Sequence, residues 1–432
     1  MIDDIAPVAE ASREAAAAPT VCVLSLSAIA DDPRVRRQAE AFHRAGWNVV
    51  GIGLPGAKSV PPEWPILTRE RKRPARPPLD RRAAKSFLGR LPERLLYLAK
   101  RLLVAAGKLA VRVHPSLACR IYWYLSRDIG EVYRCAYRLD AAVWLANDWN
   151  MLPAAARLAR QKGGFFGYDS HEFATEEYAE SRRWRLWNRP LVAAIERRFI
   201  RDAVVVSAVS GGIAERLDEI YGLARPSLVV RNTPFYEEHP FRPTGRQIRV
   251  LYHGIVAKGR GLEEAIDSVA EWPPQFELTI RGPAAAEYGR ALRERIRRSG
   301  SSGRVQLAPP VPMLRLIQEA TAFDIGFFAL PGHSRHNRFA LPNKLFEYLA
   351  AGLAVCVSDL PEMARLVAHY RVGVTFAAGE PTGIAAAVNS LDAAAIDGFK
   401  RNALAAAREL CWEREAGRLV EAYRAALADA VA

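Results

Sequence analysis

Residues 341–359 read LPNKLFEYLAAGLAVCVSD, and this stretch decides the fold. Pro342 suits the first position of a helix, and Gly352 suits the position just after a helix end. The apolar run that follows, Leu353 to Ser358, is rich in valine and predicts a buried parallel strand. A loop, a short helix and a buried strand in this order are typical of an α/β sheet.

Two polar residues of the predicted helix, Lys344 and Glu347, lie three positions apart and therefore share one face near its N-terminus. The free amides of a helix N-terminus attract phosphate. A cation, a carboxylate and unpaired amides together indicate a site for a nucleoside diphosphate. The competing interpretation is an ordinary ion pair on a helix surface.

Length and composition set the class of protein. With 432 residues, half of them apolar, the chain is long enough for two domains with cores of their own. It has no apolar run of about 18 residues, which indicates a soluble or peripheral protein. Five scattered cysteines without metal-ligand spacing predict a reduced, cytoplasmic chain without a zinc site. Residues 1–19 lack the pattern of a secretion signal, and we interpret them as a disordered lead-in.

The positive charge is concentrated in one segment. The net charge is +14, and residues 69–120 hold fifteen Lys and Arg against three acidic residues, or +12. Because this segment has few aromatic residues and no binding motif, we do not expect nucleic acid as a partner. In residues 94–113 a helical projection separates a basic side from a leucine-rich side, which fits a helix lying on an anionic membrane. Residues 81–113 are therefore a candidate contact with the inner face of the membrane; a solvated surface helix is the alternative.

Short apolar strands alternate with helical stretches along the whole chain, which predicts parallel sheets with helices on both faces. The pattern starts afresh near residue 247, so we expect two doubly wound Rossmann-like domains facing a cleft. We predict a first domain at 20–235 with a basic insertion at 69–120, and a second at 247–395. Residues 232–246 are the predicted linker, 172–200 a long helical region, and 396–432 helices that pack back on the first domain.

Residues 342–352 and the strand after them resemble the carboxyl-terminal signature of the retaining nucleotide-sugar glycosyltransferases of family four, which have the glycosyltransferase B fold. Supporting matches in the same order cover roughly residues 21–390. They are DPRVR (32–36), AND (146–148), YDSHE (168–172), VS (209–210), RNTP (231–234), YHG (252–254) and RGL (260–262). Each match alone is weak, and their order and spacing carry the resemblance.

The resemblance implies a role for individual residues. Glu347 matches the second carboxylate of a paired-glutamate motif that binds the donor's ribose hydroxyls, and His171 matches a histidine that reaches the transferring sugar. These two are the candidate catalytic residues. The competing interpretation of His171 is a histidine that satisfies backbone groups at a strand end. The candidate donor-binding residues are Gly254, Arg260, Gly261, Asn343, Lys344, Leu345 and Glu347, and no metal ligands are expected.

Two positions depart from the family pattern. The first glutamate of the pair is replaced by Phe339, and the arginine expected after the phosphate-loop glycine is Ile255. We consider a second set of donors to the sugar hydroxyls, namely His336, Asn337 and Arg338.

The expected chemistry is stabilisation of a diphosphate leaving group by Arg260, Lys344 and helix amides, without metal or other cofactor. The acidic pair Asp31-Asp32 is interpreted as loop and helix-cap chemistry. The predicted function is a retaining glycosyltransferase that moves a sugar from a uridine or guanosine diphosphate donor to an envelope glycolipid or polysaccharide precursor. The alternatives are a nucleotide-sugar epimerase of the same fold and a catalytically degenerate binding module.

Overall fold

The computed structural model describes residues 18–68 and 91–431. Most of the predicted lead-in (1–17) and residues 69–90 of the basic insertion lie outside the described residues. The described chain divides into two compact units. The first holds residues up to 208, 216–228 and 419 onward, and the second holds 209–215 and 229–418. Across the described ranges, we find no helix with the length and apolar character needed to span a bilayer.

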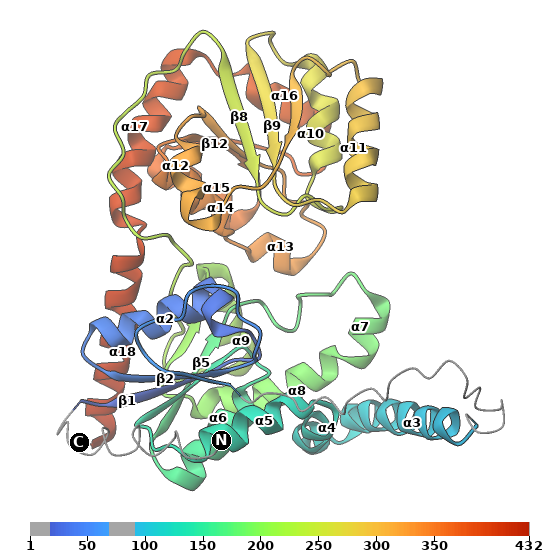
Figure 1. Cartoon of the computed structure of the whole chain (residues 1–432), viewed down its shortest axis with the longest axis vertical. Helices are drawn as coiled ribbons and strands as arrows, with labels where there is room; N and C mark the ends of the chain where they lie inside the picture. The colour runs from blue at the N-terminus through green and yellow to red at the C-terminus, as the bar shows by residue number, and fades with distance from the viewer. Residues whose placement is uncertain (1–17, 69–90, 432) are drawn as a thin grey trace, which may run out of the picture. The chain divides into compact units, whose positions relative to one another are not determined.

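The first unit is built on a seven-stranded sheet of order β3-β2-β1-β4-β5-β6-β7. Its strands are β1 (Thr20–Leu24), β2 (Asn48–Gly53), β3 (Ile66–Thr68), β4 (Val143–Asn147), β5 (Phe165–Ser170), β6 (Val206–Ala208) and β7 (Leu228–Val229). The longer helices are α2 (Pro33–Arg44), α3 (Leu91–Val113), α4 (Ala118–Leu125), α5 (Arg127–Ala136), α6 (Leu152–Lys162), α7 (Arg182–Trp187), α8 (Arg189–Phe199) and α9 (Gly211–Tyr221), of which residues 211–215 count with the second unit. In Figure 1, α2 and α18 (Trp412–Val431) lie on one face of this sheet and α5 and α6 on the other.

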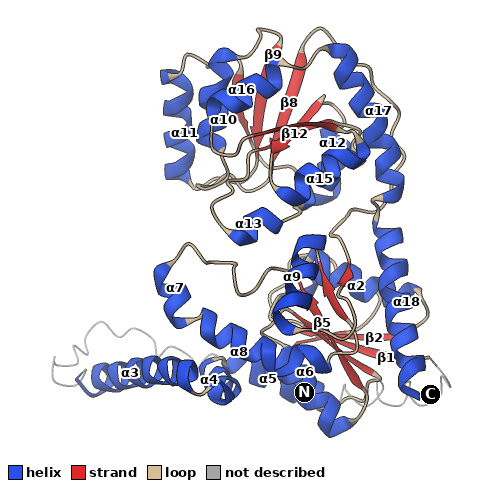
Figure 2. Cartoon of the chain, turned by 180° about the vertical axis from the view of Figure 1, so that it is seen from behind, coloured by secondary structure: helices blue, strands red, loops and turns tan. Residues whose placement is uncertain are grey.

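The second unit is built on a six-stranded sheet of order β10-β9-β8-β11-β12-β13. Its strands are β8 (Ile248–His253), β9 (Phe276–Arg281), β10 (Val305–Ala308), β11 (Ile325–Phe328), β12 (Ala354–Ser358) and β13 (Gly373–Phe376). Its helices are α10 (Leu262–Ser268), α11 (Ala286–Arg298), α12 (Leu316–Ala320), α13 (Arg335–Phe339), α14 (Asn343–Ala350), α15 (Pro361–Tyr370), α16 (Pro381–Asn389) and α17 (Ala393–Glu409). Figure 2 shows helices packed on both sides of each sheet.

The strand pairs recorded in both sheets are parallel, so the predicted α/β class with two doubly wound Rossmann-like domains is confirmed. The strand β12, predicted from its apolar run, is buried along its whole length. The predicted linker, residues 232–246, holds neither helix nor strand. In an open parallel sheet, ligands bind at the carboxyl ends of the strands, so the loops after β8, β9, β11 and β12 are the place to search in the second unit.

Two predicted details of secondary structure are wrong, and one strand was missed. The region 172–200 is not one long helix, because residues 172–181 form turns and α7 begins only after Ser181, whose side chain caps it by accepting from the Trp184 amide. The edge strand β3 was not predicted, since three residues are too few to show an alternation. Pro342 is the N-cap residue of α14, one position before the helix.

The C-terminal helix α18 completes the core of the first unit. The ring of Tyr423 lies 5.3 Å from that of Phe42 on α2. A side chain at Gly167 on β5 would collide with the Tyr423 hydroxyl, so the strand and the helix are in direct contact there. Tyr423 is fully buried, which makes the end of the chain part of the interior of the first unit.

Candidate functional site

Two adjacent residues at the end of β8 contact the two polar residues of α14. The Nε2 atom of His253 lies 2.7 Å from the Oε2 atom of Glu347. A Cβ atom on Gly254 would lie 2.3 Å from the Cε atom of Lys344. Gly254 also has a φ of +124°, which side chains rarely adopt. The lysine stem therefore occupies the space that only a glycine leaves open.

Lys344 is held in an apolar slot. Its Nζ atom lies 5.0 Å from the centre of the Phe328 ring, at the end of β11. The pKa of Lys344 is lowered to about 8, first by burial and then by the nearby Arg260, while Glu347 partly opposes the shift. A buried ammonium group beside a second cation favours an anionic ligand. Such a ligand offsets both the loss of hydration and the repulsion between the two positive charges.

Arg260 and Gly261 lie at the turn that leads into α10. Arg260 is close enough to Lys344 to influence its pKa, so the structure brings these two predicted cations into one electrostatic neighbourhood. Gly261 has a φ of +67°, and a Cβ atom there would lie 2.0 Å from the carbonyl oxygen of Ala329. The glycine thus allows the turn to pack directly on the loop after β11.

One of the amides at the start of α14 is already engaged. The amide of Leu345 donates to the carbonyl oxygen of Pro342 at 3.0 Å, so it is already used within the turn. Asn343 is exposed and Lys344 is half-buried, and their amides remain at the helix N-terminus. Leu345, one of the candidate donor-binding residues, thus has its amide engaged within the protein.

Phe339, at the position of the missing glutamate, is the last residue of α13. Its carbonyl oxygen accepts a hydrogen bond of 2.7 Å from the hydroxyl of Ser210, and a Cβ atom on Gly212 would lie 2.5 Å from its ring. Phe339 thus packs on the segment 209–215 of the same unit. Ile255, the other departure, is 59% exposed and lines a hollow of about 420 Å³ beside the loop that follows Gly254.

The first unit has a polar cluster of its own, at the carboxyl ends of β4, β5 and β6. Arg34 of α2 forms a bidentate ion pair with Asp169 of β5, with bonds of 2.7 and 2.6 Å. The hydroxyl of Ser207 on β6 donates to the same carboxylate. Burial by itself would raise the pKa of Asp169, yet Arg34 and these hydrogen bonds hold it below its usual range. Asn147 is the register partner of Asp169 and extends the polar row to β4.

His171 follows this row at the end of β5. Its pKa is lowered, first by burial and then by Arg34, while Asp169 opposes the shift. The side chain is therefore a neutral imidazole near pH 7, able to accept or donate a hydrogen bond. Asp32, by contrast, caps α2 by accepting from the amides of Arg34 and Val35, so its predicted cap role is confirmed.

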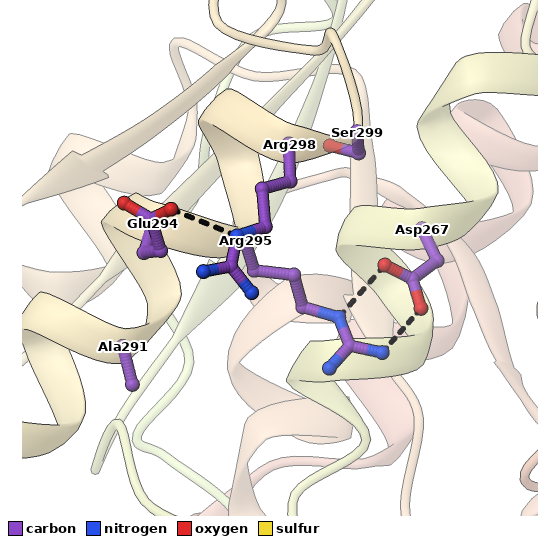
Figure 3. A pocket seen from close by; sticks show the side chains of 6 residues that line it. All are labelled: Asp267, Ala291, Glu294, Arg295, Arg298 and Ser299. Carbon is purple, nitrogen blue, oxygen red and sulfur yellow. Dashed lines mark hydrogen bonds and ion pairs between the residues drawn. The ribbon is translucent and has the colours of Figure 1, made fainter.

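Sequence reasoning missed both buried contacts, His253 with Glu347 and Arg34 with Asp169. All four residues lie in or beside the motifs quoted in the sequence analysis, so the sequence marked them as candidates. The motifs do not show which of these residues contact one another. Another hollow, of about 490 Å³, lies between α10 and α11 (Figure 3). Its charges are already matched, because Arg295 forms a bidentate ion pair with Asp267, so it is a weaker candidate for an anion site.

The contact between Gly254 and Lys344 predicts a difference between two glycine variants. Gly254→Ala and Gly259→Ala both place a side chain at positive φ, which costs about 1–3 kcal/mol of folding free energy. Only the alanine at 254 also meets the lysine, because nothing lies within 4 Å of a Cβ atom at 259. We expect Gly254→Ala to be less stable by roughly a further 1–3 kcal/mol in denaturant unfolding. Equal stability of the two variants would contradict the contact.

Comparison with known proteins agrees with this architecture. Residues 247–393 match the family model described as "Glycosyl transferases group 1". HepE (Alr3699) from Anabaena, solved with UDP and glucose, aligns with 14% identity and a TM-score of 0.66 over 94% of this chain and 100% of its own. Sucrose-phosphate synthase from Thermosynechococcus elongatus aligns with 15% identity and a TM-score of 0.66 over 95% and 100%. The lipopolysaccharide outer core galactosyltransferase WaaB aligns with 12% identity and a TM-score of 0.61 over 94% and 99%.

No curated protein matches the sequence significantly. At these identities the structural likeness shows the fold. The family match covers most of the second unit, including Gly254, Arg260, Lys344 and Glu347. The chain therefore has the glycosyltransferase B fold, and its residues 247–393 match the family model of the group 1 glycosyl transferases.

Proposed function

We propose that this protein is a retaining, metal-independent glycosyltransferase that moves a sugar from a nucleoside diphosphate sugar to an envelope glycolipid or polysaccharide precursor. The observation that carries the proposal is the group formed by Gly254, Lys344 and Glu347, where the end of β8 meets the start of α14. It places an ammonium group, a carboxylate and helix amides within one small region of the family-matched domain.

The chemistry asked of these residues is limited. Transfer breaks the bond between the anomeric carbon and the diphosphate, so negative charge increases on the leaving group. Lys344 and Arg260 supply positive charge, and the amides of Asn343 and Lys344 add the dipole of α14. Glu347 is assigned to the ribose hydroxyls. His171 of the first unit, as a neutral imidazole, is assigned to a hydroxyl of the sugar or of the acceptor.

Two neighbours of the same fold support the choice of substrates. The HepE structures contain UDP with glucose and, in another crystal, UDP-glucose. WaaB is a galactosyltransferase of the lipopolysaccharide outer core. A uridine diphosphate sugar and an envelope acceptor are accordingly the first substrates to test, with guanosine diphosphate sugars as the second panel.

The proposal is tested by incubating the protein with a panel of UDP- and GDP-sugars, with and without lipid-linked glycan acceptors. We expect nucleoside diphosphate to be released only when the acceptor is present, and EDTA to leave the rate unchanged. A nucleotide-sugar epimerase would convert the donor without acceptor. A degenerate binding module, which Phe339 and Ile255 would favour, would bind nucleotide and release nothing.

Lys344 predicts a pH dependence of donor binding. With a pKa of about 8 in the free protein, the lysine loses its proton as the pH rises through 8, so its attraction for the diphosphate is lost. We expect the affinity for UDP to fall about twofold between pH 7 and 8 and then by up to about tenfold per pH unit. Calorimetric titration of the wild type and of Lys344→Met between pH 7 and 9.5 measures this. The same slope in both proteins would refute the assignment.

We extend the proposal to a cytoplasmic protein bound to the inner face of the membrane through α3. Leu102 and Val113 on this helix are 71% and 73% exposed, and Leu103 and Leu109 are also exposed. These positions form an apolar surface in the most basic part of the chain, as binding to anionic lipid requires. Lys108, on the basic side of the helical projection, donates a hydrogen bond to Asn188.

Vesicle co-sedimentation tests the membrane contact. We expect the wild type to pellet with phosphatidylglycerol vesicles and not with phosphatidylcholine vesicles, and the double variant Leu102→Ser/Leu109→Ser to lose most of that binding. Leu314→Ser is the matched control, because Leu314 is 95% exposed in the second unit. Equal pelleting with both lipids would exclude an electrostatic membrane contact.

A further inference from the structure

His253 has no role in the proposed function so far, although it is the residue that contacts Glu347. Its side chain is 1% exposed, whereas the Glu347 side chain is 23% exposed. The histidine thus supports the carboxylate from inside the protein, and the carboxylate is the member of the pair that solvent, or a ligand, can reach.

Tyr348 holds both the ring and the backbone of His253. It packs on the ring of Tyr348 with centroids 4.7 Å apart, and its backbone amide donates to the Tyr348 hydroxyl at 3.1 Å. That hydroxyl in turn donates to the carbonyl oxygen of Phe327 at 3.1 Å, which ties it to β11. Because the His253 ring is held in this way, it has little rotational freedom, and its Nε2 atom can orient the carboxylate of Glu347. A carboxylate on a flexible glutamate side chain otherwise loses rotamer entropy when it binds a ligand.

The same end of β8 also holds Lys344, through the contact at Gly254. Residues 253 and 254 thus contact residues 347 and 344 of α14. The proposed ribose group and the proposed diphosphate group are positioned by one short piece of backbone, which fixes the distance between them.

We propose that His253 is a positioning residue that aims the carboxylate of Glu347 at the donor's ribose, and so sets the preference of the protein for ribonucleotides over deoxyribonucleotides. This inference rests on the proposed function, because it takes the ligand to be a nucleoside diphosphate. A purely structural role for His253 would affect stability and total affinity, but it would not change the ratio of affinities for ribose and deoxyribose.

The test is therefore that ratio. Calorimetry measures the binding of UDP and GDP, and then of the 2′-deoxy and 3′-deoxy forms of whichever binds more tightly. A hydrogen bond to a charged group changes affinity about 10- to 100-fold, so we expect the wild type to prefer ribose over at least one deoxy form by that factor. In His253→Phe, which keeps a ring against Tyr348 but has no nitrogen, we expect the preference to fall to within about threefold of unity.

Three further variants sharpen the result. His253→Gln retains an amide that can contact Glu347, so we expect it to regain part of the preference. His369→Phe is the matched control, because His369 is an exposed histidine of the same unit, and it should keep the full preference. Glu347→Gln combined with His253→Phe should lose no more than either change alone.

The outcomes separate the two claims. If the wild type binds no nucleoside diphosphate, the proposed function fails and this inference fails with it. If the wild type binds one but does not distinguish ribose from deoxyribose, or if folded His253→Phe keeps the full preference, the inference is wrong and the proposed function stands.

Discussion

Replacing Lys344 with methionine is expected to lower kcat by roughly 100- to 1000-fold, the loss typical of removing one group that stabilises a developing negative charge. Methionine has nearly the same shape as the lysine stem, so it fills the slot between Gly254 and Phe328. The slot stays packed and only the charge is lost. Because burial already disfavours the lysine's charged form, we expect the variant to be at least as stable as the wild type in denaturant unfolding.

This combination, lost activity with unchanged or higher stability, distinguishes a catalytic charge from a packing role. Steady-state rates with the donor and acceptor found in the panel assay measure it. Lys258→Met is the control, since Lys258 is an exposed lysine of the neighbouring loop. A Lys344→Met rate within about threefold of the wild type would show that the leaving group is stabilised elsewhere.

Replacing Arg34 with methionine is expected to destabilise the first unit by about 3–5 kcal/mol, because it leaves the carboxylate of Asp169 buried without its partner. Both side chains are almost completely inaccessible, at 1% and 0% exposure, so water cannot replace the guanidinium. Arg44→Met on the same helix is the control. Its ion pair with Glu40 is on the surface, where such pairs contribute at most about 1 kcal/mol.

Two further observations would identify the cause. Because the pKa of Asp169 is lowered in the folded protein, the stability from this pair is present above its ordinary pKa of about 3.9 and is lost as the pH falls below it. The difference between wild type and Arg34→Met should therefore shrink in acid. The double variant Arg34→Met/Asp169→Leu should regain much of the stability, since apolar replacements of a buried pair are often tolerated. A persistent loss in the double variant would indicate a packing defect instead.

The strand and helix pattern was predictable wherever a local rule applied. The run before Gly352 and the valine-rich strand after it determine α14 and β12, because capping and burial act over a few residues. The turns at 172–181 were not predictable, since their polar sequence also suits a helix and tertiary contacts decide between the two.

The candidate site was predictable in its residues and not in its contacts. Lys344 and Glu347 share a helical face, which three-residue spacing guarantees. Their partners His253 and Gly254 lie about 90 positions earlier, and Arg34 lies 135 positions before Asp169. Contacts of that kind depend on strand order and register, which no single motif contains.

The burial of Tyr423 against Phe42 and Gly167 has a consequence for synthesis on the ribosome. Domains usually acquire their structure in order of translation. Here the first unit lacks the Tyr423 ring of its interior until residues 419 onward have left the exit tunnel, whereas the second unit is complete at residue 418. Chains that stop before residue 419 are therefore expected to leave the apolar surface around Phe42 and Gly167 uncovered.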